Sequence, residues 1–364
     1  MRVIIIAVLI LVSCQLVVGQ TPGPFKTIDL STQTFEGRGW NSGLKNNYDR
    51  FPARAEQTVR KEVWNLSENG AGLYLRFQTN AAEIVIKYTV TGARQMNHMP
   101  ATGVSGVDLY SRSKAGQWSW SAAKYSFGDT VVYRYTNLNK EDGREYTLYL
   151  PLYNHVSWME IGYPADAMFT FAEASKQKPI VIYGTSIAQG GCASRPGLAW
   201  TNILGRKIQS PVINLAFSGN GRMEKEVFEL ISEVDAGLYV LDCLPNMAGP
   251  SYVNGELKKR LLEGIGFLQS HKPGVPILLT DHCGYTDELT NDVSKNSYQA
   301  ANKIQLAVYD SLKAAGVKNL YYLTKNEIGL NIESTVDGIH PNDIGMMQYA
   351  EAYFKKLRKI LKER

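Results

Sequence analysis

Ser186 stands where a serine hydroxyl could act as a nucleophile. It lies in the stretch KPIVIYGTSIAQGG, where the apolar run Ile180 to Tyr183 predicts a buried strand and Gly184 begins a turn. Ligands of doubly wound sheets gather outside the carboxyl ends of the strands, so the hydroxyl is expected to face a substrate there. Taken alone, Gly-Thr-Ser is also compatible with a helix N-cap or an anion-binding turn. A catalytic role therefore depends on a base elsewhere in the chain.

A serine nucleophile needs a histidine with a carboxylate behind it. His340 meets this requirement, because Asp337 precedes it by three residues in STVDGIHPND and a helical turn puts side chains at that spacing on one side. We expect Asp337 to accept a hydrogen bond from one ring nitrogen of His340 while the other nitrogen faces Ser186. The alternative is structural, with Asp337 capping the turn and His340 packing under it.

The other four histidines are weaker candidates. His282 follows Asp281 directly, and neighbouring side chains of a strand point to opposite faces, so this aspartate is poorly placed to orient the ring. His271 lies in a polar connection after a helix, while His98 and His155 fall in the β-rich first half of the chain. The histidine of VDGIH is therefore the expected base.

Acyl transfer also needs hydrogen-bond donors for the developing oxyanion. One apolar run ends in NLAFSGNG, where Gly219 has no side chain to hinder its N–H, and the next ends in LDCLPNM, where Asn246 offers an amide. With the N–H of Ser186 they would form a hole of three donors. Separately, Gly219 is a turn residue and Asn246 a helix cap. Their joint position at the ends of successive strands favours the catalytic interpretation.

The periodicity of the chain changes near residue 175. Before it, alternating apolar residues in LYLRF and EIVIKYTV predict strands with one buried face, separated by turns. Residues 20–175 are therefore predicted to form an independent antiparallel β-sandwich without helices. From 176 to 364, five apolar runs alternate with helical segments, which predicts an α/β domain with a five-stranded parallel sheet covered on both faces.

The candidate residues resemble the four blocks of the SGNH, or GDSL-like, hydrolases: Gly184-Thr185-Ser186-Ile187, Gly219, Asn246 and Asp337-x-x-His340. Thr185 stands where the family usually has Asp, and LPNM lacks the Gly and Asp that commonly flank the third-block Asn. The resemblance implies a flavodoxin-like, three-layer α/β/α fold without metal or organic cofactor. It also implies that Ser186 is the nucleophile, His340 the base and Asp337 its orienter, and that Gly219 and Asn246 are oxyanion donors.

A second resemblance lies in the first half. GVDLY, residues 106–110, is similar to the Gly-x-Asp-Leu-Tyr signature of an accessory domain found ahead of such hydrolases in Bacteroidetes-type bacteria. This context implies activity on acyl esters, and on carbohydrate esters in particular. Arg195, close after the nucleophile in CASRPG, is a candidate contact for a polar or acidic substrate, with a surface salt bridge as the alternative.

The net charge and the N-terminal residues restrict the partners and the location that we expect for the protein. The 39 basic and 34 acidic residues are interspersed and leave a net charge of +5, which does not indicate a nucleic-acid partner. Residues 1–19 are typical of an export signal, which predicts a periplasmic or extracellular protein, with lipidation at Cys14 as the alternative. Their apolar run is shorter than the about 20 residues that span a bilayer, so no stable membrane span is expected.

Cys192, Cys243 and Cys283 do not resemble a zinc framework in their spacing. We interpret them as small buried residues, with one disulfide as the alternative in an oxidising compartment. The oligomeric state stays open.

The leading hypothesis is an exported serine esterase that removes acetyl or other short acyl groups from carbohydrates. The lack of a long apolar lid segment and the small residues after Ser186 predict an open, polar cleft. The rival hypotheses are a lipase or thioesterase for longer acyl chains and a non-catalytic glycan-binding protein. A further rival is a metal-dependent phosphoesterase that would use Asp242, Asp281, His282 and His340.

Overall fold

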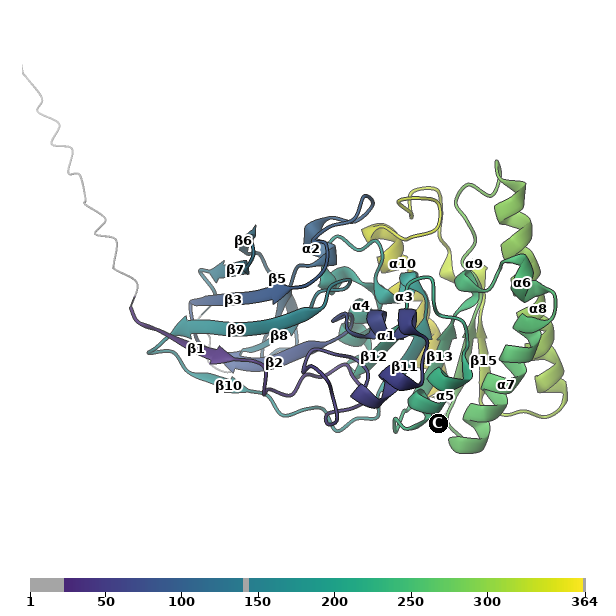
Figure 1. Cartoon of the computed structure of the whole chain (residues 1–364), viewed down its shortest axis with the longest axis horizontal. Helices are drawn as coiled ribbons and strands as arrows, with labels where there is room; N and C mark the ends of the chain where they lie inside the picture. Colours follow the sequence, from purple (N-terminus) through teal and green to yellow (C-terminus); the bar gives the residue numbers. More distant parts are fainter. Residues whose placement is uncertain (1–22, 140–143, 363–364) are drawn as a thin grey trace, which may run out of the picture.

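The computed structural model describes residues 23–139 and 144–362, which form a pair of packed antiparallel sheets followed by an α/β unit (Figure 1). The expected export signal at residues 1–19, with Cys14, lies outside the described residues. Among the helices of the described part, none combines the length and the apolar character needed to cross a membrane.

The two antiparallel sheets enclose an apolar core, because their strands alternate inward and outward side chains. Leu75, Phe77, Ile84, Ile86 and Tyr88 all lie in this core, as their spacing predicts. The first sheet contains, in spatial order, β1 (Phe25–Asp29), β9 (Val156–Pro164), β3 (Glu83–Val90), β7 (Val131–Thr136) and β6 (Lys124–Phe127). The second contains β10 (Phe169–Phe171), β2 (Tyr74–Thr79), β8 (Glu145–Tyr149), β4 (Asp108–Arg112) and β5 (Trp118–Ser121).

The second part of the molecule is built on a parallel sheet of five strands. In spatial order these are β12 (Val212–Ala216), β11 (Ile180–Gly184), β13 (Leu238–Asp242), β14 (Ile277–Thr280) and β15 (Leu320–Leu323). Relative to the chain this order is 2-1-3-4-5, the doubly wound arrangement of flavodoxin-like folds. The predicted α/β/α domain is confirmed.

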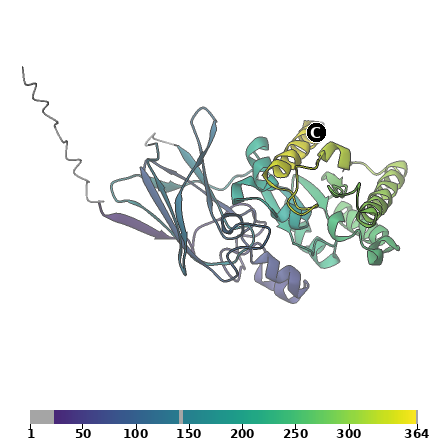
Figure 2. The same ribbon diagram turned by 90° about the horizontal axis from the view of Figure 1, so that it is seen from above.

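Helices cover both faces of the parallel sheet (Figures 1 and 2). The longer ones are α4 (Trp200–Ile208), α5 (Lys225–Ser232), α7 (Glu256–His271), α8 (Asp292–Ala314) and α10 (Asp343–Lys362). The shorter ones are α3 (Ser186–Gln189), η2 (Pro196–Leu198), η3 (Leu244–Asn246), α6 (Pro250–Val253) and α9 (Lys325–Ile328). Val181 and Tyr183 of β11 pack towards α5, α7 and α8, whereas Ile180 and Ile182 pack towards α4 and α10. Burial on both faces explains why each strand is a continuous apolar run.

The first half differs from the expected independent sandwich because it contains helical segments. These are η1 (Ala53–Gln57), α1 (Lys61–Ser67) and α2 (Ala101–Val104). Ala55 of η1 and Val63 and Trp64 of α1 belong to the same apolar core as strands β11 and β12. Figure 1 shows α1 beside the parallel sheet, so the two halves share a core.

The two halves share a core because the parallel sheet has an open edge that must be covered. β12 is an outer strand, whose outward carbonyls need hydrogen-bond partners. Nη1 of Arg50, which is fully buried, donates to the carbonyl oxygens of Asn214 and Ala216, both at 2.9 Å. The segment between β1 and β2 thereby covers the edge.

Candidate active site

Ser186, His340 and Asp337 form a continuous hydrogen-bonded chain. Ser186 begins α3 directly after β11, and its Oγ lies 2.8 Å from Nε2 of His340. Nδ1 of His340 lies 2.7 Å from Oδ2 of Asp337. Because an ionised carboxylate only accepts hydrogen bonds, we assign the ring proton to Nδ1, which leaves Nε2 to accept from the serine hydroxyl. This is the arrangement in which a serine is activated as a nucleophile.

The segment from Asp337 to His340 is a bent turn and not the helical turn that its spacing suggested. Oδ1 of Asp337 accepts from the N–H groups of Ile339 at 3.2 Å and His340 at 2.8 Å. Gly338 between them has a φ of +94°, which glycine adopts without strain. One carboxylate therefore fixes both the ring and the backbone of the histidine.

The same hydrogen bonds set the charge of Asp337. Partial burial by itself would raise its pKa, but the bonds from the backbone and ring of His340 outweigh burial and hold the pKa below its usual value. The carboxylate is therefore ionised at neutral pH and can stabilise a positive charge on the ring.

Gly219 and Asn246 lie on loops that follow neighbouring strands, β12 and β13. Within the described part of the chain, the N–H of Gly219 makes no hydrogen bond, and its φ of +69° suits glycine. Oδ1 of Asn246 accepts from the N–H of Gly221 at 3.0 Å, while its Nδ2 has no partner among the described residues. Both donors are thus free to bind an oxyanion.

Gly221 brings these loops against the turn before the nucleophile. A Cβ at residue 221 would lie 2.2 Å from the carbonyl oxygen of Gly184 and 3.1 Å from the nitrogen of Thr185, so no larger residue fits without a shift. Asn246, bonded to Gly221, is therefore held close to Ser186. The N–H of Ser186 itself opens α3 and has no partner within that helix.

Removal of the Asn246 donor should slow catalysis. We expect Asn246→Ala to lower kcat by about 10² to 10³, because one oxyanion donor typically contributes that much. Asn246→Asp is the matched variant: it keeps an oxygen for the N–H of Gly221 but offers no donor, so we expect a similar loss. Steady-state kinetics on 4-nitrophenyl acetate measures both. An Asn246→Asp enzyme with nearly full kcat would remove Asn246 from the oxyanion hole.

An open pocket of about 430 Å³ lies over His340 and is walled by both halves of the protein. This volume falls within the range of small-molecule sites. The second half contributes Gly191, Ser218 and Asn220 together with His340; the first half contributes Glu62, Asn65, Leu66, Met96, His98, Met99 and Tyr153. The pocket is open, as expected, but the prediction of a polar cleft is wrong, because most of the lining surface is apolar and includes one leucine and two methionines.

Tyr153 and Gln189 stabilise the segment that carries the nucleophile, and the sequence analysis did not identify either residue. The hydroxyl of Tyr153, from the first half, donates to the carbonyl oxygen of Ser186 at 3.0 Å. The buried side chain of Gln189 accepts from the N–H of Ser218 at 2.9 Å and donates to the carbonyl oxygen of Leu152 at 3.2 Å. Gln189 thereby ties α3 to the loop that carries Gly219. A glutamine in an otherwise apolar turn was the only signal in the sequence.

His98, which the sequence analysis considered a weaker candidate for the base, also lies at the site. It lies in a tight turn closed by backbone hydrogen bonds between Met96 and Met99, at 3.0 and 3.2 Å. Its ring centroid lies 5.8 Å from that of His340. Its place in the β-rich half gave no reason to expect this, because the contact depends on how the two halves dock.

The residues of the phosphoesterase hypothesis do not converge. His282 is buried, stacks on Tyr298 and accepts from the N–H of Gly284, and burial lowers its pKa to about 3. Asp242 is buried and accepts from the hydroxyl of Tyr353. Of the residues that the structure describes, only His98, Cys192 and His340 form a group of three metal-ligating side chains. His282 is thus also unsuited to act as the base.

Arg195 does not reach for substrate but joins the two halves, which corrects its candidate role. Its Nη1 donates to Oδ2 of Asp108 at 2.6 Å and to the hydroxyl of Tyr110 at 2.7 Å. The same Oδ2 accepts from the N–H of Gly197 at 2.9 Å. Arg195 does form the salt bridge given as the alternative, but the bridge lies between the halves, with Asp108 buried and Arg195 partly buried.

This contact explains the GVDLY signature. Asp108 and Tyr110 hold the loop of the second half around Arg195, while Leu109 between them is fully buried in the sandwich core. A Cβ at Gly106 would lie 2.3 Å from the carbonyl oxygen of Thr102, so the tight approach requires glycine. The motif therefore holds the two halves together, and we call its contact between Asp108 and Arg195 the clasp.

The three described cysteines are buried free thiols, as interpreted from the sequence.

Comparison with known proteins shows the family of the chain. The sequence profile of the GDSL-like lipase/acylhydrolase family matches residues 177–358. A crystal structure of a Bacteroides ovatus protein assigned as a GDSL-like lipase is 31% identical with a TM-score of 0.86, over 93% of this chain and 98% of that one. The chain belongs to the GDSL-like lipase/acylhydrolase family. A second profile, GxDLY, the N-terminus of SGNH-hydrolase-type esterases, matches residues 25–169, so this enzyme is a carboxylic ester hydrolase with that accessory region.

More distant structures share the fold of this GDSL-like esterase. The salicylyl-acyltransferase SsfX3 of a tetracycline biosynthetic pathway is 18% identical with a TM-score of 0.72, over 92% of this chain and 97% of that one. A family two carbohydrate esterase from Clostridium thermocellum, in complex with cellohexaose, is 12% identical with a TM-score of 0.52, over 80% of this chain and 92% of that one. The comparison with curated proteins gave no match.

Proposed function

We propose that this GDSL-like esterase is an exported serine esterase that removes acetyl or other short acyl groups from carbohydrates. The observation that carries the proposal is the chain of two hydrogen bonds, 2.8 Å from Ser186 to His340 and 2.7 Å from His340 to Asp337. The free donors of Gly219 and Asn246 on the adjoining loops support it.

The reaction proceeds in two acyl-transfer steps. Oγ of Ser186 attacks the ester carbonyl while Nε2 of His340 takes its proton, and Asp337 stabilises the resulting imidazolium. The N–H groups of Ser186 and Gly219 and the amide of Asn246 bind the oxyanion. His340 then gives the proton to the sugar oxygen as the ester C–O bond breaks, and the sugar leaves with a free hydroxyl. A water molecule, deprotonated by the same ring, cleaves the acyl-enzyme and releases the acid.

A carbohydrate as the acyl carrier is supported by two features. The fold is shared with family two carbohydrate esterases, and the pocket carries the polar residues Glu62, Asn65 and Asn220, which suit sugar hydroxyls. The predicted export signal at residues 1–19 is consistent with a glycan outside the cytoplasm. A non-catalytic binding protein would not need the Ser186–His340–Asp337 chain.

Hydrolysis of longer acyl esters is the second candidate, because Leu66, Met96 and Met99 give the pocket an apolar wall. A long chain buried there would gain about 0.8 kcal/mol for each methylene. The pocket is open to solvent, however, so a long chain would stay largely hydrated.

A series of ester substrates separates the two candidates. We expect kcat/KM to fall from 4-nitrophenyl acetate to the octanoate, and acetylated oligosaccharides to release acetate. Turnover of the nitrophenyl series and acetate release are measured on the same enzyme preparation, with Ser186→Ala as the blank. A kcat/KM that rises with chain length, with no acetate from any glycan, would favour the lipase.

A further inference from the structure

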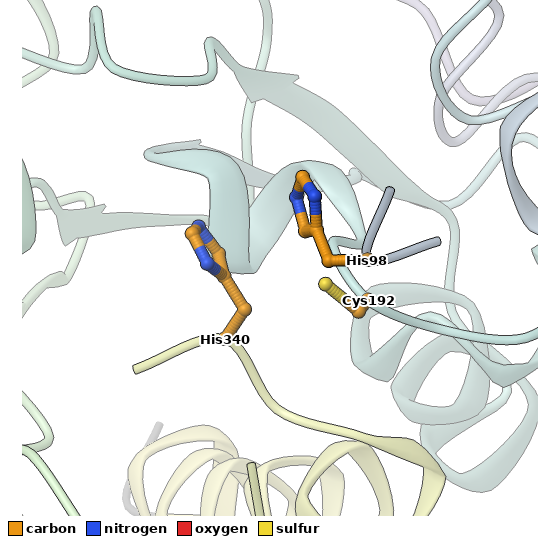
Figure 3. Close-up of side chains that lie close together, drawn as sticks. All are labelled: His98, Cys192 and His340. Carbon is orange, nitrogen blue, oxygen red and sulfur yellow. The ribbon is translucent and has the colours of Figure 1, made fainter. Parts of the chain in front are cut away.

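Three side chains that coordinate metals well converge over the nucleophile. His98, Cys192 and His340 each offer a ligand atom, and these atoms lie within 4.8 Å of one another (Figure 3). They come from three separate segments: the turn before α2, the loop after α3 and the turn before α10. The figure shows Cys192 pointing towards the space between the two rings.

Two of the three groups have no competing hydrogen bond among the described residues. Among the described residues, the ring nitrogens of His98 make no hydrogen bond, and neither does the thiol of Cys192. The thiols of Cys243 and Cys283, by contrast, each lie 3.5 Å from a carbonyl oxygen that accepts from them. The N–H of Cys192 donates to the carbonyl oxygen of Pro341 at 3.0 Å, which fixes this cysteine beside His340.

We propose that these residues form an inhibitory zinc site. Two imidazoles and one thiolate are a ligand set that zinc accepts, with the fourth position left to water. With bonds of about 2.0 to 2.3 Å, a tetrahedral zinc holds its ligand atoms about 3.5 Å apart, so small side-chain rotations suffice. The carboxylate of Asp337 holds Nδ1 of His340, as carboxylates do behind zinc-bound histidines, and so presents Nε2 to the metal.

Zinc at this position would block catalysis directly. Coordination occupies the Nε2 lone pair that accepts the Ser186 proton, and it releases the Cys192 proton to solvent. The site therefore makes the esterase sensitive to free zinc. The inhibition rests on the proposed role of His340 as the base, whereas the binding itself does not.

Binding is tested first, in a variant that needs no activity. Zinc is titrated calorimetrically into Ser186→Ala protein, where we expect one ion per chain. Adding His98→Ala or Cys192→Ala should weaken the affinity at least about tenfold, since even a residue behind a metal ligand contributes about 10- to 100-fold. Adding His271→Ala, which removes an exposed histidine far along the chain, should change nothing. Equal affinities in all four proteins would overturn the site.

Inhibition is then measured on the wild type with 4-nitrophenyl acetate. We expect zinc to abolish turnover and a chelator to restore it. The Cys192→Ala and His98→Ala enzymes, each compared with its own rate without zinc, should require at least about tenfold more zinc for the same inhibition. An active enzyme whose inhibition by zinc is unchanged in both variants would refute the proposal, whereas an inactive wild type with intact zinc binding would refute the esterase mechanism instead.

Discussion

The Ser186→Ala enzyme is expected to lose on the order of 10⁴ to 10⁶ in kcat on 4-nitrophenyl acetate, because removal of a triad serine leaves only the oxyanion donors and binding. The fold should not change, since Ser186 is a small buried residue at the start of α3, and the only hydrogen bond of its Oγ among the described residues is the one to His340. Circular dichroism and the unfolding midpoint in urea check this. A rate near that of the wild type would remove Ser186 as the nucleophile.

Covalent labelling gives a second readout of the same assignment. A fluorophosphonate should add once to the wild type, as seen by mass spectrometry, and not at all to Ser186→Ala. Ser218→Ala is the matched control, because this serine lines the same pocket but has no histidine partner. Labelling of Ser186→Ala, or loss of labelling in Ser218→Ala, would point to a different serine.

Asp108→Ala is expected to destabilise the protein by about 3 to 5 kcal/mol, because it leaves the largely buried guanidinium of Arg195 without its carboxylate. Burial raises the pKa of Asp108, and the Arg195 charge together with the hydrogen bonds from Trp120 and Gly197 counters that rise. The variant therefore breaks a whole set of contacts between the halves. Equilibrium unfolding in urea measures the change in free energy.

Asp129→Ala is the matched control for this change. Asp129 lies in the same half but its side chain is fully exposed, 3.6 Å from Arg94, so its loss should leave the unfolding curve in place. If Asp108→Ala unfolded at the same urea concentration as Asp129→Ala, the GVDLY signature would not be a clasp.

Much of the secondary structure could be predicted from local pattern, although the helical segments η1, α1 and α2 of the first half were not predicted. The spacing of Ile84, Ile86 and Tyr88 indicates a half-buried strand, and the unbroken apolar run from Ile180 to Tyr183 a strand buried on both faces; both are found. Such patterns are local because a strand or helix presents its faces at a fixed period. The same reasoning predicted no helix at Lys61–Ser67, and it could not place α1 against the parallel sheet, because apolar residues bury equally well against either half.

The sequence by itself determined the chemical identity of the candidate site. Ser186, Gly219 and Asn246 follow the neighbouring strands β11, β12 and β13, and parallel strands deliver their carboxyl ends to one edge. The meeting of these three residues is therefore a consequence of the strand order, whereas the Asp337–His340 pair reaches Ser186 through the loop after α9.

Only the tertiary structure decided what surrounds that site. Tyr153 behind the nucleophile, His98 over the base and the Asp108–Arg195 clasp all join segments from different halves of the chain. Their positions depend on how the halves dock, and docking is set by long-range features such as the open edge of β12 that Arg50 covers. No spacing within either half encodes those contacts, because the distances involved are fixed by packing and not by the period of a strand or helix.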